Sequence, residues 1–176
     1  MIDSDGNLVG EENEIVGSYS NLSFMPDIET DGTNYLLVWT RYRSSSGPGD
    51  VYGILISQTG TPIGTKFRIS LGNTINASFP NIAWDGTNYL VVWQLGFPSQ
   101  DPIIQGQFIS STGQLVGNNF TIRPSSIPST ANQIYPAVAF NGTNYLVVWD
   151  DDRIDGDDRN ISVSYTHLTL PTICSV

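Results

Sequence analysis

The residues with the clearest potential for chemistry are the carboxylates of "DDDRIDGDDR" at 150–159. Aspartates packed this densely repel one another unless a cation or arginine side chains compensate their charge. Oxygen ligands on a flexible loop are what Ca²⁺ binds. Two interpretations therefore stay open for the run. It is either a solvated acidic loop, partly neutralised by its own arginines, or a calcium site whose ligands would be Asp150, Asp152, Asp155 and Asp157.

Other reactive side chains are scarce. The single histidine, His167, and the single cysteine, Cys174, both lie in the segment "VSYTHLTLPTICSV" at 163–176. This segment resembles the translated read-through of a sequencing adapter, so we expect it to be a non-native tail. Without it the chain has no usual base or nucleophile for a catalytic triad and no imidazole or thiolate for a metal site. We therefore expect no resident cofactor other than Ca²⁺.

Paired carboxylates about 5 to 10 Å apart would suit glycoside hydrolysis. The loops that follow Trp39 and Trp93 bring only Asp50 and Asp101 to that role. The same loops carry Tyr42 and Phe97, which we take as candidate ligand-binding residues because aromatic rings offer large contact surfaces. Nothing in the sequence marks either aspartate as a catalytic acid.

A repeated nonapeptide indicates which elements position these loops. The stretch "DGTNYLLVW" at 31–39 returns as "DGTNYLVVW" at 85–93 and as "NGTNYLVVW" at 141–149. The tryptophans recur after 93 − 39 = 54 and 149 − 93 = 56 residues, and each copy has a proline (Pro26, Pro80, Pro136) five residues before its Asp or Asn. The opening "IDSDGNLVG" also matches "ISQTGTPIG" at 56–64, so the sequence begins inside a repeat.

Each period predicts four strands and no helix. In the second copy, "NIAW" ends at a turn signal and "NYLVVW" is apolar on both faces, since alternate residues of a strand point to opposite sides. Such a strand must be covered on both sides. An antiparallel sheet of about 54 residues that stacks on copies of itself is typical of a β-propeller blade.

The fold prediction is therefore all-β: a β-propeller fragment of four-stranded antiparallel blades, about three blades' worth, as an open arc. We expect the last strands of a blade at 1–16, whole blades at 24–70 and 78–123, and the first strands of another at 134–162. The structural residues of the repeat are the turn glycines and the aromatic residues that fill the space between blades: Gly32, Gly86, Gly142, Tyr35, Tyr89, Tyr145, Trp39, Trp93 and Trp149.

The pattern "P-x-(I/V)-A-x-(D/N)-G-T-N-Y-L-V-V-W-x-D-x-R", followed by "D-(I/V)-Y-G", resembles the propeller-like repeats of uncharacterised secreted or surface proteins of bacteria. The resemblance covers residues 1 to about 162 and implies an extracellular or cell-surface location. It specifies a repeat type and no activity, since propellers serve as enzymes, lectins and scaffolds. The second copy departs from the pattern, because "WQLGFPSQDP" lacks the Asp and Arg after the tryptophan.

Charge and hydropathy limit the classes of partner that this chain is expected to bind. A net charge of −10 repels nucleic-acid phosphates and anionic lipids, and no apolar run reaches the length of a membrane helix. We therefore expect neither nucleic acid nor membrane as partner, but a protein or carbohydrate at the loop surface, and self-association of exposed blade ends. The favoured function is a non-catalytic interaction or scaffold propeller, not an enzyme. A Ca²⁺- or carbohydrate-binding propeller is the alternative, and a fragment of a carbohydrate-active enzyme the third hypothesis.

Overall fold

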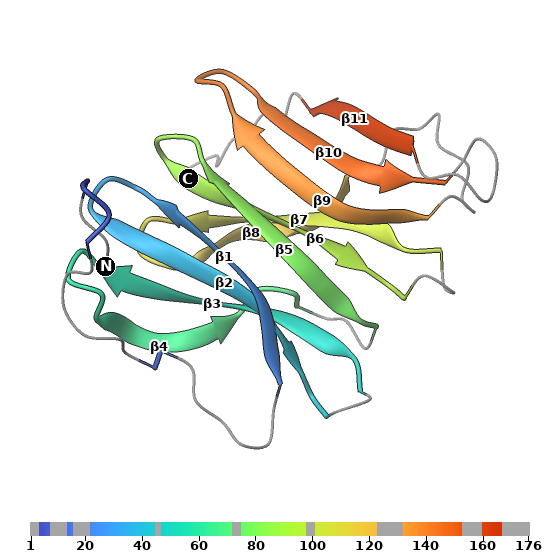
Figure 1. Ribbon diagram of the computed structural model, residues 1–176. Helices are drawn as coiled ribbons and strands as arrows, with labels where there is room; N and C mark the ends of the chain where they lie inside the picture. The colour runs from blue at the N-terminus through green and yellow to red at the C-terminus, as the bar shows by residue number, and fades with distance from the viewer. Residues whose placement is uncertain are drawn as a thin grey trace, which may run out of the picture.

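The computed structural model of this chain describes residues 4–7, 14–15, 22–44, 47–71, 75–97, 101–122, 132–152 and 160–166. These residues form eleven strands in three antiparallel sheets (Figure 1). The first sheet contains β1 (Ser23–Thr30), β2 (Asn34–Tyr42), β3 (Gly49–Ser57) and β4 (Pro62–Arg68) in that order. The second contains β5 (Ala77–Trp84), β6 (Asn88–Leu95), β7 (Ile103–Ser110) and β8 (Leu115–Ile122). The third contains β9 (Gln133–Phe140), β10 (Tyr145–Asp151) and β11 (Asn160–Thr166).

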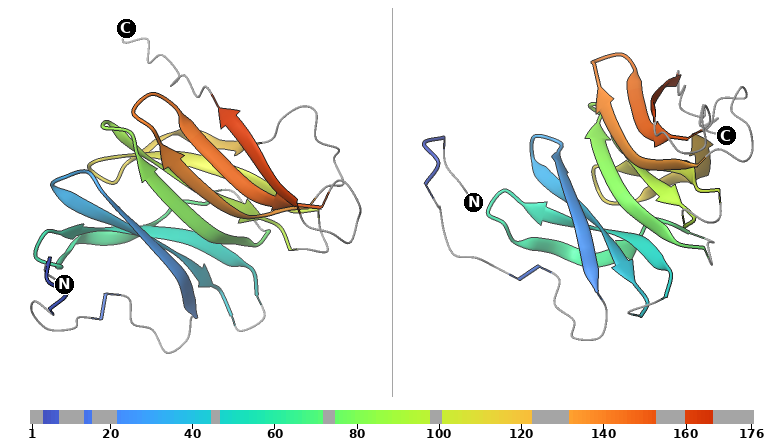
Figure 2. Two further views of the ribbon diagram at one scale, coloured as in Figure 1. Left: turned by 45° about the horizontal axis from the view of Figure 1, so that its top comes forward. Right: turned by 45° about the vertical axis from the view of Figure 1, so that its right-hand side comes forward.

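The three sheets are stacked side by side as successive propeller blades (Figure 2). Strand β5 packs beside both β1 and β9, so the first strand of each sheet lies next to its counterpart in the neighbouring sheet. The predicted all-β propeller arc is confirmed. The three nonapeptides form equivalent second strands in successive sheets, because each continues from its turn into β2, β6 or β10. Within the described residues, no helix is long and apolar enough to span a membrane.

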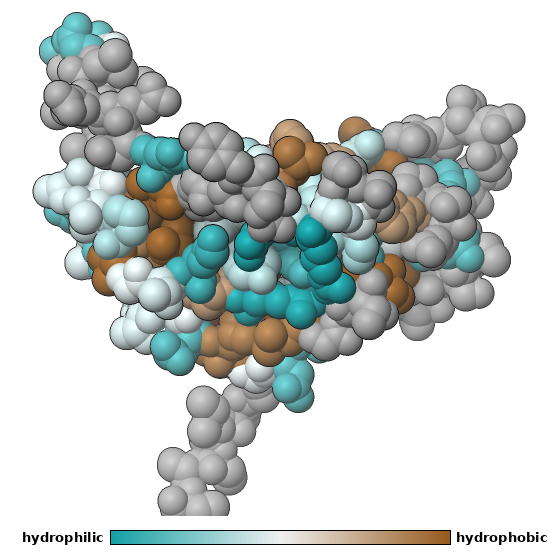
Figure 3. Space-filling model, turned by 90° about the horizontal axis from the view of Figure 1, so that it is seen from below, coloured by the Kyte–Doolittle hydropathy of each residue, from teal (hydrophilic) through white to brown (hydrophobic). Residues whose placement is uncertain are grey.

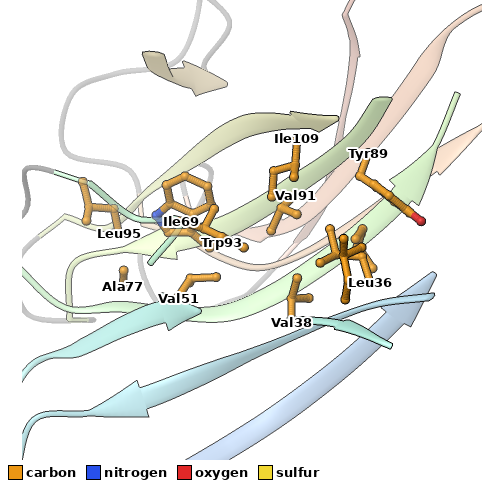
Figure 4. Packing of buried hydrophobic residues seen from close by; sticks show 12 residues of the cluster. Leu36, Val38, Val51, Ile69, Ala77, Tyr89, Val91, Trp93, Leu95 and Ile109 are labelled. Carbon is orange, nitrogen blue, oxygen red and sulfur yellow. The ribbon is translucent and has the colours of Figure 1, made fainter. Parts of the chain in front are cut away.

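The contact between the first two sheets follows from the alternation in the repeat. Tyr89, Val91 and Trp93 of β6 point toward the first sheet, where they meet Leu36 and Val38 of β2 (Figure 4). The opposite face of β6, with Leu90 and Val92, packs against the third sheet. There the partners are the corresponding residues of β10: Tyr145, Val147 and Trp149. Every residue of β6 is buried, as a strand covered on both faces requires.

The turns between first and second strands also repeat. Each glycine of the Asp-Gly or Asn-Gly pair has a positive φ: 86° at Gly32, 94° at Gly86 and 94° at Gly142. The Asp85 Oδ1 atom accepts hydrogen bonds from the backbone N–H groups of Thr87 and Asn88, both at 2.7 Å. Asp31 and Asn141 accept equivalent bonds from the two residues that follow their glycines. The Asp or Asn side chain therefore holds the turn as an Asx motif.

One strand begins earlier than the sequence predicts. Strand β5 starts at Ala77, although the pattern placed the strand at 81–84 after Pro80. The proline is accommodated by a register shift between Ser78 and Asn81, which is a β-bulge. A bulge leaves one residue without a ladder hydrogen bond, and this is where a strand tolerates proline.

Candidate ligand-binding site

The bulges gather at one end of the blades. We call this the loop end: the end where β1, β5 and β9 begin and where β2, β6 and β10 finish. In all three sheets the residue before the bulge proline has a left-handed backbone, with φ of 57° at Met25, 56° at Phe79 and 52° at Tyr135. This conformation is unfavourable for residues other than glycine, so it persists only where the surroundings impose it. Because it recurs in all three sheets, the left-handed residue is a regular feature of the repeat.

The three residues at the bulges, Met25, Phe79 and Tyr135, are linked across the blades, and we call them the bulge row. The rings of Phe79 and Tyr135 meet edge to face with centroids 4.5 Å apart. The Thr40 hydroxyl oxygen accepts a hydrogen bond from the Phe79 N–H at 3.2 Å and lies 3.9 Å from the Met25 sulfur. Tyr135 is 45% exposed, so the row ends at a partly open aromatic ring. Such rings pack against apolar faces of ligands.

A polar ladder runs beside the bulge row and connects the sheets. The Asp27 Oδ2 atom accepts hydrogen bonds from the Asn81 side chain at 2.6 Å and from the Ile82 N–H at 3.0 Å. The Asn81 Oδ1 atom accepts in turn from the Val138 N–H at 2.6 Å. The first strands of the first and second blades thus each supply an acceptor for a backbone N–H in the first strand of the next blade. This ladder fixes the spacing of β1, β5 and β9, and so the spacing of the bulge row.

A buried aspartate anchors the loop after β2. The Asp50 carboxylate accepts from Arg43 Nε and Nη2 at 2.8 Å each and is 2.5 Å from Arg68 Nη2. The hydrogen bonds that Arg43 donates to Asp50 raise the pKa of the Arg43 guanidinium. The Gly49 N–H in the same loop donates to the Asn76 side chain at 2.8 Å, which joins the loop to the second blade. With both of its oxygens engaged by arginines, Asp50 is a structural anchor.

The two aromatic residues predicted to bind ligand both lie at the loop end. Tyr42 is the last residue of β2, and its ring meets Phe24 edge to face at 6.0 Å. Partial burial raises the pKa of the Tyr42 hydroxyl. Phe97 is the second residue after β6 and is partly exposed. The view from below shows polar (teal) and apolar (brown) side chains side by side on the surface (Figure 3).

Of the aspartates predicted to bind calcium, Asp155 and Asp157 lie outside the described residues, as do Arg153, Arg159, His167 and Cys174. Asp152 accepts hydrogen bonds from the Asn132 backbone N–H and side chain. Asp150 lies opposite Ile161, and its neighbour Asp151 accepts from the Trp149 indole N–H at 3.2 Å. No group of three His, Cys, Asp or Glu side chains within the described part of the chain is placed to hold a metal ion. Calcium binding by the acidic loop stays a prediction.

The aromatic residues predicted to be structural lie between the blades. Trp39, Trp93 and Trp149 are 2%, 0% and 1% exposed. Burial, with the Asp31 carboxylate nearby, raises the pKa of the Tyr89 hydroxyl, and burial with Asp85 nearby raises that of Tyr145. Tyr35 packs on a smaller cluster with Trp39 on the far face of the first sheet. The sequence missed the bulge row, although the recurrent prolines at 26, 80 and 136 were its signal.

A hollow lies at the opposite, turn end of the blades. It has a volume of about 500 Å³ and is lined by Asp31, Asn34, Trp84 and Thr112, among others. Its walls are the Asp-Gly turns and the loop after β7, so its polar groups are largely those that hold the turns. The loop end combines aromatic rings with strained backbone and is therefore the better candidate site.

Comparisons with known proteins support the fold and leave the family unassigned. No family model matches the chain, and no curated protein matches it. Among solved structures, the chain is similar to an endo-arabinase from Bacteroides thetaiotaomicron, with a TM-score of 0.59, 13% identity, and coverage of 94% of this chain and 63% of the other. It is also similar to a Bacillus subtilis arabinanase, with a TM-score of 0.55, 18% identity, and coverage of 85% and 53%.

An α-L-arabinofuranosidase from Lactobacillus brevis matches with a TM-score of 0.56, 10% identity, and coverage of 82% and 52%. This chain therefore spans between about half and two thirds of the lengths of these three neighbours. At such identities the likeness shows a shared propeller fold.

These neighbours correct the functional expectation. The sequence favoured a non-catalytic scaffold and no enzyme activity. The comparison contradicts both expectations, because the solved structures with similar blades include an arabinanase, an endo-arabinanase and an endo-arabinase. The error has a physical cause. The repeated residues specify packing between blades, and they dominate the pattern. The candidate binding residues Phe79 and Tyr135 stand at a position of the repeat that carries a different side chain in each copy, so the repeat gives no signal for them.

Proposed function

We propose that this chain forms part of a carbohydrate-active β-propeller of the glycoside hydrolase type, acting on arabinose-containing polysaccharide. The proposal rests on one combination: the bulge row presents a partly exposed aromatic ring at the loop end of a fold that arabinan-cleaving enzymes share. Sugar rings have apolar faces that pack on aromatic rings and hydroxyl groups that bind polar side chains. A polymeric substrate of this kind favours an extracellular or cell-surface location.

Within this proposal the chain contributes the binding surface. The rings of Phe79 and Tyr135 would contact a sugar, and the polar ladder from Asp27 to Val138 would hold the three first strands in register beneath it. Asp27 and Asp50 are engaged by hydrogen bonds and ion pairs, which suits positioning. Bond cleavage is assigned to the complete propeller.

Calorimetric titration with a linear arabino-oligosaccharide tests the binding role. We expect the substitution Tyr135→Ala to weaken binding by about threefold to tenfold, the loss of one aromatic contact. The matched control is Ile63→Ala, which removes a similarly exposed apolar side chain (41%) from the opposite, turn end of the first sheet, where β4 begins. Absence of binding, or equal weakening by the two substitutions, would contradict the proposal.

Release of reducing sugar from arabinan by the purified chain tests the catalytic part. Cleavage of arabinan, with xylan left intact, would support glycoside hydrolysis by these blades. Binding without cleavage would confine this chain to substrate recognition and assign the reaction to blades beyond it.

A further inference from the structure

Both contacts between neighbouring sheets are built from the same two faces. One face, which we call the Trp face, carries alternate residues of the second strand, such as Tyr89, Val91 and Trp93. The other, the Leu face, carries the residues between them, such as Leu90 and Val92. In each contact the Leu face of one sheet meets the Trp face of the next. The repeat thus defines a directional, self-complementary interface.

The third sheet presents a further Leu face. It consists of Leu146 and Val148 of β10 together with Ile161 and Val163 of β11, since Val148 is paired with Val163 and Asp150 with Ile161. Ile161 is 79% exposed and Val163 is 53% exposed. The residue equivalent to Ile161 in the second sheet is Ile104, which is fully buried by the third sheet. Contiguous apolar residues left exposed on a sheet face indicate an interaction surface.

The first sheet carries the matching Trp face, with Tyr35, Leu37 and Trp39. Ile15 packs beside these residues. Its equivalents one and two repeats later, Ile69 and Ile122, lie in the two contacts between the described sheets. Ile15 therefore lies on the first sheet where Ile69 and Ile122 lie between two stacked sheets. The Trp face of the first sheet can accordingly accept the Leu face of another sheet.

Two polar features match these particular faces to each other. The ladder position held by Asp27 and Asn81 is Ala137 in β9, which offers no acceptor to a following blade. The corresponding N–H of the first sheet, that of Ile28, is already bonded to the Asp27 Oδ1 atom at 2.9 Å and needs none.

The second feature is charge. Asp150 extends the Leu face of β10, and Arg41 extends the Trp face of β2 beyond Trp39, with its guanidinium 5.3 Å from the Tyr52 ring centroid. When these faces stack as the described ones do, the acidic and basic side chains approach each other.

We propose that the Leu face of the third sheet docks on the Trp face of the first sheet of a second copy of this chain. Repetition of the contact in both directions joins two copies, each with three described sheets, into one closed ring. A ring of about six blades lies within the range of four to eight that closed propellers adopt.

Sedimentation equilibrium of the full chain at about 1 to 50 μM tests the proposal. We expect a dimer, and we expect Ile161→Glu to raise its dissociation constant at least about tenfold, because a charge would be buried in an apolar contact. Leu71→Glu is the control, at a position that is 50% exposed and lies outside both faces. A wild-type monomer, an open series of larger oligomers, or equal effects of the two substitutions would overturn the proposal. A monomer would assign the Leu face to a following blade of a longer protein.

A charge exchange tests the pairing of the faces. Asp150→Arg and Arg41→Asp should each weaken the dimer several-fold, because each brings like charges together across the contact. The double variant restores opposite charges and should return the dissociation constant to within about threefold of the wild type. Additive weakening in the double variant would show that Asp150 and Arg41 do not meet and would overturn the docking geometry.

Discussion

The buried tyrosines show how one side chain couples packing to pH. The Tyr145 hydroxyl donates to the Asn88 carbonyl across the blade contact at 3.3 Å. The Tyr89 hydroxyl is buried without a hydrogen-bond partner of good geometry in the described structure. Burial raises both pKa values above that of tyrosine in the unfolded chain, which is about 10. The folded state therefore keeps both hydroxyls protonated where the unfolded state loses its protons.

We expect these tyrosines to make the protein unstable at alkaline pH. Their contribution is fully present below pH 10 and is lost as the pH rises toward the folded pKa values, by up to about 1.4 kcal/mol per pH unit for each tyrosine. Urea unfolding at pH 7.5 and pH 11 measures this dependence. Tyr89→Phe should leave stability at pH 7.5 within about 0.5 kcal/mol and reduce the loss at pH 11, since it removes the titrating group.

Tyr145→Phe serves as the comparison for that experiment. It should also reduce the loss at pH 11, but it should cost up to about 1 kcal/mol at pH 7.5, because the Asn88 carbonyl loses its donor. An unchanged pH dependence in both variants would show that neither hydroxyl titrates above its ordinary range.

The sequence predicted residues that act through packing or turn geometry. The glycines at 32, 86 and 142 follow from the need for positive φ, and the tryptophans from the alternation of apolar residues. The left-handed backbone of Met25, Phe79 and Tyr135 could not be predicted in this way. A residue before proline is usually extended, so the pattern indicated a strand boundary where the chain instead forms a bulge.

At the scale of elements, glycines in the third strands leave space for side chains at and after the fourth strands to pack against the sheets. A Cβ atom at Gly106 would lie 2.9 Å from the Phe120 Cζ atom and 3.1 Å from the Ile122 Cδ1 atom. Gly53 meets Phe67 and Ile69 in the same manner. In β11 the equivalent residue is Val163, which pairs with Val148 as Gly106 pairs with Val92. The third strand of the last sheet therefore lacks the space that the other two keep for a fourth-strand phenylalanine.

We expect Gly106→Ala to destabilise the protein by about 1 to 3 kcal/mol through overpacking. Urea unfolding measures the loss, and Phe120→Leu supplies the matched test because it removes the distal part of the ring that the new methyl group would touch. The double variant should lose less than the sum of the two single variants, since the residues are in contact. Strict additivity would show that the ring moves aside without cost.

Elements were predictable in kind and less so in extent. Period-2 alternation identified the strands, because both faces of β2, β6 and β10 must be covered by neighbouring sheets. The predicted strand boundaries were wrong where proline interrupts the pattern, as at the start of β5, and where the last sheet departs from the repeat. Val163–Thr166 belong to the segment expected to be a non-native tail, yet they pair with β10.

At the scale of the whole molecule, recurrence of one interface is enough to predict the architecture but not the chemistry. Each sheet buries its faces only against other copies of itself, so the repeat predicts a propeller from any two complete periods. The bulge row at the loop end consists of side chains that differ in each copy: Met25, Phe79 and Tyr135. Because these residues are not repeated, the periodicity that predicts the fold passes over them.

Truncation separates the tail from the last blade. Removal of residues 167–176 should change the free energy of unfolding by less than about 0.5 kcal/mol, because β11 and all its pairs with β10 remain. Removal of residues 160–176 should cost more, about 1 to 3 kcal/mol, since it strips β10 of one neighbour and exposes another strand edge. Urea unfolding of both variants beside the full chain measures the difference. Equal losses would show that β11 contributes nothing beyond what residues 167–176 contribute.

If the two-copy ring forms, the longer truncation also removes Ile161 and Val163 from the Leu face, so it should dissociate the dimer while the shorter truncation leaves it intact.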